Sequence, residues 1–183
     1  MKFDALDLTV MSNAFAMIAE EMGTVLVRGA LSPNIRERRD ASAALFDAEG
    51  RMVAQAAHIP VHLGAMPESV RVVRALGPKP GDVFLLNDPY DGGSHLPDLT
   101  LVEAIGGVGS ARAGNRKAGN RKAGNSKAGM GRTGAVVGYA AVRAHHADVG
   151  GMSPGSMPQG ATELVQEGLV IPPERLVKEG VLD

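Results

Sequence analysis

A short repeat in the middle of this 183-residue chain limits how the rest of it can fold. Residues 113–129 contain the unit Ala-Gly-Asn-Arg-Lys twice and Ala-Gly-Asn-Ser-Lys once, and end on Ala-Gly. The repeat has no apolar face, so ordering it would cost conformational entropy without burying apolar surface in return. We therefore predict a disordered basic insert at about 111–134, and the fold must be built from the residues on either side of it.

The same insert concentrates the positive charge of the chain. It carries seven Lys and Arg residues, and without it 12 basic residues face 20 acidic ones, a net charge of −8. A basic tract attracts nucleic acid through the phosphates, but single-strand binders add aromatic side chains on which the bases stack. No aromatic residue interrupts this tract. We predict a solvated loop and no role in binding nucleic acid.

The spacing of apolar residues predicts an α+β fold for residues 1–183, taken as one domain with the insert inside it. Spacings of three and four from Leu6 to Val25 indicate a long N-terminal helix with one buried face, and a short helix is expected from Pro67 to Gly77. Apolar runs predict strands at 44–46, 52–54, 83–86, 99–105 and 135–142. We expect residues 161–182 to form broken helical turns. The predicted architecture is a loop-rich one, with helices packed on a mostly antiparallel sheet.

Several classes of protein are disfavoured by what the sequence lacks. There is no cysteine, which excludes disulfides, thiolate metal sites and a cysteine nucleophile. No run of 18 apolar residues and no basic-then-apolar leader occurs, so we expect a cytoplasmic protein without a membrane segment. The P-loop, the nucleophile elbow and the dinucleotide fingerprint are also absent, so any ATP chemistry would belong to another chain.

Two glycine-rich segments hold three of the five histidines, each within three residues of an aspartate. His95 and Asp98 precede one predicted strand, and His145 follows another. If these strands pair as a hairpin around the insert, their outer ends bring His95 near His145. Imidazole and carboxylate groups are common ligands of divalent cations. The structural alternatives are a His–Asp hydrogen bond in a turn for the first segment and a surface pair of histidines near a carboxylate for the second. Because neighbouring residues in a strand point to opposite sides, His145 and His146 should have different roles.

Two further groups of residues have both a structural and a functional interpretation. His58 and His62 lie without acidic neighbours, where neutral imidazoles serve in proton transfer or substrate binding, or simply bond to the backbone. Arg36 and Arg38 belong to a dense charged run, which is either an exposed ion-paired segment or an arginine fork for an anion.

Several unusual strings of the chain occur in the order found in one protein family. Residues 32–40, 58–64, 86–98 and 143–151 together resemble the N-terminal part of the hydantoinase B/oxoprolinase family. The resemblance runs from about residue 6 to residue 180 and is interrupted by the repeat. It implies a fragment of a B-type subunit in an ATP-dependent hydrolase that opens 5-oxoproline or hydantoin-type rings. A metal-binding subunit of an acetone-type carboxylase and a non-catalytic interaction module are the alternatives.

The resemblance also implies roles for individual residues. The family's carboxylases hold their metal with a His-x-x-Asp pair and a later histidine, which correspond here to His95, Asp98 and His145. The ion would be manganese, zinc or iron, and an A-type partner subunit would bind ATP and phosphorylate the cyclic amide. The remaining candidates are His146 and Asp148 for proton transfer, and Arg36, Arg38, His58 and His62 for substrate contacts.

Overall fold

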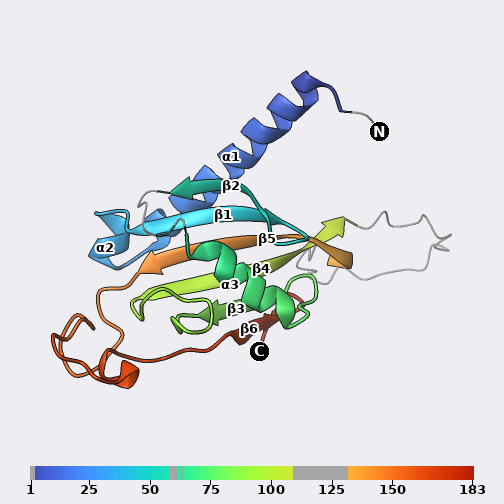
Figure 1. Cartoon of the computed structure of the whole chain (residues 1–183). Coiled ribbons are helices and arrows are strands. Elements are labelled where there is room, and N and C mark those ends of the chain that lie inside the picture. Colours follow the sequence, from blue (N-terminus) through green and yellow to red (C-terminus); the bar gives the residue numbers. More distant parts are fainter. Residues whose placement is uncertain (1–2, 58–61, 63, 109–131) are drawn as a thin grey trace, which may run out of the picture.

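A seven-stranded sheet forms the centre of the computed structural model, which describes residues 3–57, 62, 64–108 and 132–183 (Figure 1). The strand order is β2-β1-β5-β4-β3-β6-β7, and each neighbouring pair is antiparallel. The strands are β1 (Ala41–Asp47), β2 (Met52–Ala57), β3 (Val83–Leu86), β4 (Asp98–Val108), β5 (Arg132–His145), β6 (Glu174–Lys178) and β7 (Val181–Leu182). The predicted α+β class with an antiparallel sheet is confirmed.

One face of the sheet carries the main core under helix α3 (Met66–Ala75). Side chains alternate along each strand, so Phe84 and Leu86 of β3 and Val102 of β4 point toward α3 and are buried. Val70 and Val73 on one side of α3 pack against them. In Figure 1 this helix lies in front of the central strands.

Part of the other face, over β1 and β2, is covered by helix α1 (Ala5–Gly29), which is followed by the short helix α2 (Pro33–Arg36). Asp4 caps α1, since its side chain accepts a hydrogen bond from the amide of Asp7. The predicted helix is confirmed, but its predicted buried face is wrong. Ala19 and Gly23 are the buried positions, whereas Leu6 is 71% exposed. The reason is that α1 packs on β1 and β2 with its C-terminal half and projects beyond the sheet with its N-terminal half (Figure 1).

By length and composition, α1 is the one described helix that meets the criterion for a membrane span, with a mean hydropathy of 1.2 over its best window. Core helices of water-soluble proteins and signal sequences meet the same criterion. The result therefore gives weak support for a membrane segment.

Strands β4 and β5 pair as the sequence predicted, on the two sides of the repeat. Their register runs from Asp98 opposite His145 to Val108 opposite Arg132. Most of the predicted insert lies outside the described residues, and its last three residues, 132–134, belong to β5. The pairing brings the two histidine-bearing ends of the strands to one edge of the sheet.

The prediction of helical turns over residues 161–182 is wrong. This segment contains one 3-10 turn, η2 (Leu164–Gln166), and then adds β6 to the edge of β3 and β7 to β6. Without β6, the backbone amide and carbonyl groups on that edge of β3 would lack strand partners. Asn87 fixes the returning chain, because its side chain donates to the carbonyl of Leu169 and accepts from the amide of Ile171.

Candidate metal centre

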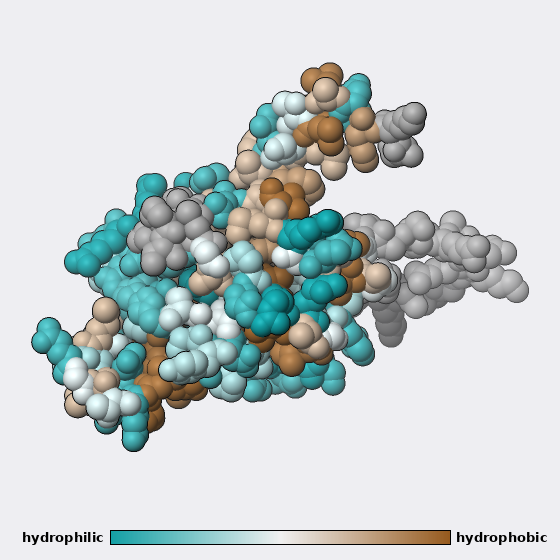
Figure 2. Space-filling model, in the orientation of Figure 1, coloured by the Kyte–Doolittle hydropathy of each residue, from teal (hydrophilic) through white to brown (hydrophobic). Residues whose placement is uncertain are grey.

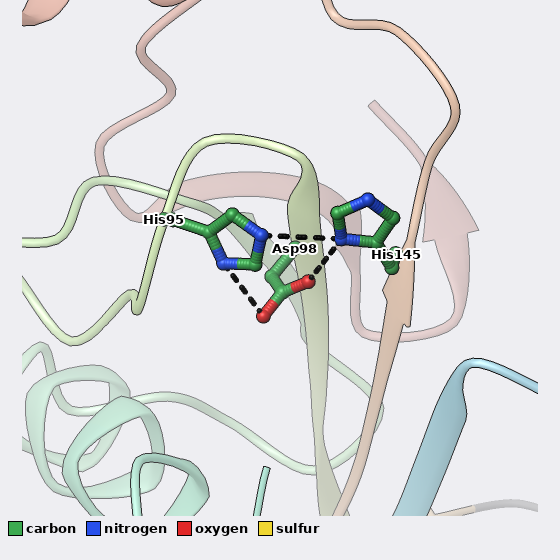
Figure 3. A group of neighbouring side chains, drawn as sticks. All are labelled: His95, Asp98 and His145. Atoms are coloured by element: carbon green, nitrogen blue, oxygen red, sulfur yellow. Dashed lines mark hydrogen bonds and ion pairs between the residues drawn. The ribbon is translucent and has the colours of Figure 1, made fainter. Parts of the chain in front are cut away.

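Three side chains meet where β4 begins and β5 ends. His95 comes from the loop before β4, Asp98 is the first residue of β4, and His145 is the last residue of β5 (Figure 3). His95 Nε2 lies 3.1 Å from His145 Nδ1, and His145 Nδ1 lies 3.1 Å from Asp98 Oδ1. The predicted approach of His95 to His145 is therefore confirmed.

Asp98 is the buried member of the group, with 1% of its side chain exposed. Its Oδ2 accepts a hydrogen bond of 2.6 Å from the hydroxyl of Ser94 and lies 3.0 Å from Nδ1 of His95. Burial alone would raise the pKa of Asp98, but hydrogen bonds from His62, His95 and Ser94 hold it far below its ordinary value. The same Asp98 hydrogen bond raises the pKa of His95, against the opposite effect of burial. The cluster thus keeps a carboxylate charged at a buried position.

The loop that presents His95 depends on two glycines. A Cβ on Gly93 would lie 2.2 Å from the carbonyl oxygen of Asn87, and Gly92 has a φ of +92°, which favours glycine. The carbonyl of Gly92 accepts hydrogen bonds from the hydroxyl of Ser69 on α3 and from Arg143. The loop is therefore held against α3 and the sheet.

Arg143 lies beside this loop and is completely buried. Its Nε donates to the hydroxyl of Thr100 at 2.7 Å, and its Nη2 donates to the hydroxyl of Ser69 at 2.8 Å. Burial lowers its pKa, and the negative charge of Asp98 opposes that shift. Sequence reasoning missed this residue, although a basic residue on the inward side of an apolar strand pattern was a signal for it.

His62 was predicted to contact substrate, but the structure puts it in the interior next to Asp98. Its side chain is 2% exposed, and its Nε2 lies 3.5 Å from Asp98 Oδ2. Of the other residues predicted to contact substrate, His58 lies outside the described residues, and Arg36 and Arg38 are exposed at and just after the end of α2.

The two residues predicted to transfer protons, His146 and Asp148, contact different parts of the structure. His146 is half-buried, its amide donates to the carbonyl of Pro97, and burial lowers the pKa of its ring. It lines an apolar cavity of about 520 Å³ on the α1 side of the sheet. Asp148 is exposed, and its carboxylate accepts hydrogen bonds from the amides of Gly150 and Gly155, which lower its pKa. These hydrogen bonds hold the loop that follows β5.

The geometry of the cluster suits a divalent cation. One ligand atom from each of His95, Asp98 and His145 lies within 4.8 Å of the others. Two ligands about 2.1 Å from one ion, at tetrahedral or octahedral angles, lie about 3.0–3.4 Å apart. Both the His95–His145 and the His145–Asp98 distances, each 3.1 Å, fall within that range. Three protein ligands leave coordination positions open for water or substrate, as in catalytic sites.

Comparison with known proteins agrees with the resemblance in the sequence. The family model described as hydantoinase B/oxoprolinase matches residues 4–183. A 5-oxoprolinase of Saccharomyces cerevisiae is 39% identical over 99% of this chain, and a 5-oxoprolinase of Dictyostelium discoideum is 38% identical over 98% of it. The chain spans only 12% of the length of each of these relatives.

Solved structures share the fold at lower identity. The ATP-dependent caprolactamase of Pseudomonas jessenii superposes with a TM-score of 0.72 at 24% identity, covering 100% of this chain and 28% of that one. An acetone carboxylase, whose carboxylation is ATP-dependent, gives a TM-score of 0.72 at 18% identity, covering 96% of this chain and 21% of that one. At these identities the likeness establishes the fold alone.

Proposed function

The chain belongs to the hydantoinase B/oxoprolinase family, and from this premise we propose that it is a B-type part of a cyclic-amide hydrolase. Its substrates would be 5-oxoproline or hydantoin-type rings, and its centre would be a divalent cation held by His95, Asp98 and His145. The observation that carries the proposal is the convergence of these three side chains at the paired ends of β4 and β5. Two 5-oxoprolinases are 38–39% identical to this chain over nearly its whole length, which favours hydrolysis over carboxylation.

The roles of the residues follow from their contacts. When bound, the cation would polarise a carbonyl oxygen or activate water. Asp98 offers Oδ1 to the cluster while Ser94 and His95 bind its Oδ2. His146 lines an apolar cavity, and burial lowers the pKa of its imidazole, which suits the ring to proton transfer. Substrate contacts by Arg36, Arg38 and His58, and proton transfer by Asp148, remain predictions from the sequence.

We infer that ATP is used by an A-type partner subunit or domain, which would phosphorylate the amide carbonyl. The absence of a P-loop motif from this chain supports this division of work, as does the small share of the related 5-oxoprolinases that the chain spans. A cytoplasmic location fits a chain without cysteine, and it also remains a prediction.

The metal centre is tested by measuring metal bound to the purified protein and to single variants. We expect one equivalent of manganese, zinc or iron in the wild type, and an affinity at least about 100-fold weaker in His95→Ala, Asp98→Asn and His145→Ala, since second-shell changes alone reach that size. His146→Ala is the matched control, because it removes a neighbouring imidazole that is not in the cluster. A metal-free wild type, or an equal loss in the control, contradicts the proposal.

The reaction is tested by combining the chain with an A-type subunit, ATP and 5-oxoproline. We expect glutamate to form in a metal-dependent way, with no product from the Asp98→Asn variant. A parallel mixture with bicarbonate and a ketone in place of 5-oxoproline tests the alternative, and carboxylation of the ketone there, without ring opening in the first mixture, would favour the carboxylase. A metal-binding chain that supports neither reaction would favour an interaction module.

A further inference from the structure

We propose that His62 is a positioning residue, which fixes the Asp98 carboxylate from its buried side so that Oδ1 faces the metal site. This inference rests on the proposed metal centre. His62 precedes α3, far along the chain from His95 and His145, and touches the cluster through Asp98. Neither the family match nor the similar proteins assigns it a role.

The two oxygens of Asp98 have different surroundings. Oδ1 lies 3.1 Å from Nδ1 of His145, on the side where the three candidate ligands converge. Oδ2 has three neighbours: Ser94 Oγ at 2.6 Å, His95 Nδ1 at 3.0 Å and His62 Nε2 at 3.5 Å. Donors on Oδ2 hold the carboxylate in one orientation and leave Oδ1 directed at the cluster.

His62 is the most buried of these three neighbours. Ser94 is exposed and 38% of the His95 side chain is accessible, while His62 is 2% exposed. A side chain in the interior has few alternative rotamers, so its position is fixed by packing. His62 therefore contacts Asp98 from the interior, whereas Ser94 and His95 contact it from the more exposed loop.

The other side of the imidazole is also held. His62 Nδ1 lies 3.1 Å from the hydroxyl of Ser42, which is fully buried on β1. Nε2 faces Oδ2 of Asp98 and, at 3.6 Å, Oδ1 of Asp40. Carboxylate oxygens only accept hydrogen bonds, so the tautomer that fits these contacts has its proton on Nε2 and accepts the Ser42 hydroxyl at Nδ1. Ser42 thus orients the ring, and the ring presents an N–H to Asp98.

The register of the sheet explains how this chain of contacts is built. Ser42 pairs with Arg143, and Arg143 pairs with Thr100, two residues after Asp98 on the same face. The face under α3 therefore carries a buried polar row directly beside the metal cluster. His62 connects Ser42 of that row to the carboxylate.

The test compares metal affinity, measured by calorimetry with Mn²⁺ and Zn²⁺, in the wild type and in His62 variants. We expect His62→Ala to weaken binding by about 10- to 100-fold, the usual effect of removing a second-shell partner. His62→Gln should restore most of the affinity, because its amide nitrogen offers an N–H near the position of Nε2. The absorption bands of the Co²⁺-loaded protein should shift in the Ala variant and return in the Gln variant.

The Ser42→Ala variant tests whether Ser42 acts on Asp98 through His62. If Ser42 acts through His62, adding Ser42→Ala to His62→Ala should cause no further loss of affinity. Ser156→Ala is the matched control, because it also removes a buried serine hydroxyl, but one bonded to the backbone of Val149 and Gly150 in the loop after β5. It should match Ser42→Ala in lost stability while retaining more of the metal affinity.

The outcomes separate the two proposals. A wild type that binds no metal overturns the metal centre, and the role of His62 with it. A wild type that binds metal, together with a His62→Ala variant of equal affinity and unchanged Co²⁺ spectrum, overturns the role of His62 alone. Loss of affinity that Gln does not restore, in a variant whose circular dichroism shows unfolding, assigns His62 a purely structural role and also overturns the inference.

Discussion

The two faces of the sheet differ in what they bury. Under α3, the strand residues are completely enclosed and include a polar row with Arg143, Thr100 and Ser42 beside the apolar core. On the α1 face, the buried strand residues lie on β1 and at the end of β5, where Ala41, Ala43 and Ala144 lie against the helix region. Farther along that face, the outward residues of β3 and β4, such as Leu85 and Leu101, stay half-exposed.

The buried polar residues and the candidate metal centre therefore lie on one side of the sheet, and the other side contributes mainly apolar packing. The α3 face holds charges in a dry interior, where each one needs a partner, and the candidate metal centre lies at its edge. The buried residues of the α1 face form an apolar cluster, and the projecting end of α1 adds exposed hydrophobic surface, visible at the top of Figure 2. Substitutions on the first face should therefore disturb both the fold and the metal site, whereas those on the second should cost less stability and leave the metal site intact.

The largest contrast is expected between two neighbours on β5. Arg143→Ala should lower the free energy of unfolding by about 3–4 kcal/mol, because it leaves a cavity and removes the donors bonded to Thr100 and Ser69. Val142→Ala, on the opposite face and half-buried, should cost about 1 kcal/mol. Urea unfolding followed by circular dichroism measures both, and equal losses would contradict the difference between the faces.

Two neighbouring leucines on β3 allow a second comparison, in which the same substitution is made on each face of the sheet. Leu86 is fully buried under α3, and Leu85 next to it is half-exposed on the other face. Leu86→Ala should cost about 3 kcal/mol and Leu85→Ala about 1 kcal/mol, because only the first leaves an enclosed cavity. If Leu85→Ala proved as costly in the purified chain, the open face would have to be covered in solution.

Helix α1 allows a buried residue to be compared with an exposed one within a single element. Ala19 is completely buried, so Ala19→Leu should overpack the contact of α1 with the sheet and cost about 1–3 kcal/mol. Met17, two residues earlier, is 72% exposed, and Met17→Lys should change stability by no more than about 0.5 kcal/mol. Thermal unfolding of both variants checks the prediction, which fails if Met17→Lys is the more damaging.

The smallest effect should come from the exposed loop after β5. The amides of Gly155 and Gly150 hold the pKa of Asp148 below its ordinary value. Because this pKa is lower in the folded state, the charged Asp148 stabilises the loop at any pH above its unfolded pKa of about 3.9. The stabilisation is lost as the pH falls through the folded-state pKa. Hydrogen exchange at these two amides should accelerate in acid relative to Gly180, whose amide donates to the backbone of Gly81. In Asp148→Ala the acceleration should already be present at neutral pH.

Local patterns in the sequence were sufficient for most of the elements. Spacings of three and four residues located α1 and α3, and short apolar runs located β1 to β5, because these signals depend only on which residues are near in the chain. The segment at 161–182 was misread as helical because the free edge of β3, which turns it into strand, is formed by residues far away in the sequence. The apolar stripe of α1 was misread for a related reason, since the sheet reaches only half of the helix.

For the candidate site, the sequence by itself determined the donors and the strand ends that carry them: His95, Asp98 and His145. Only the tertiary structure decided what surrounds these donors. The buried contacts of Asp98 with His62, and of Arg143 with Ser69 and Gly92, join elements that are distant along the chain. Which side chains are enclosed, and which pairs of charges share a dry interior, depend on how the helices and strands pack.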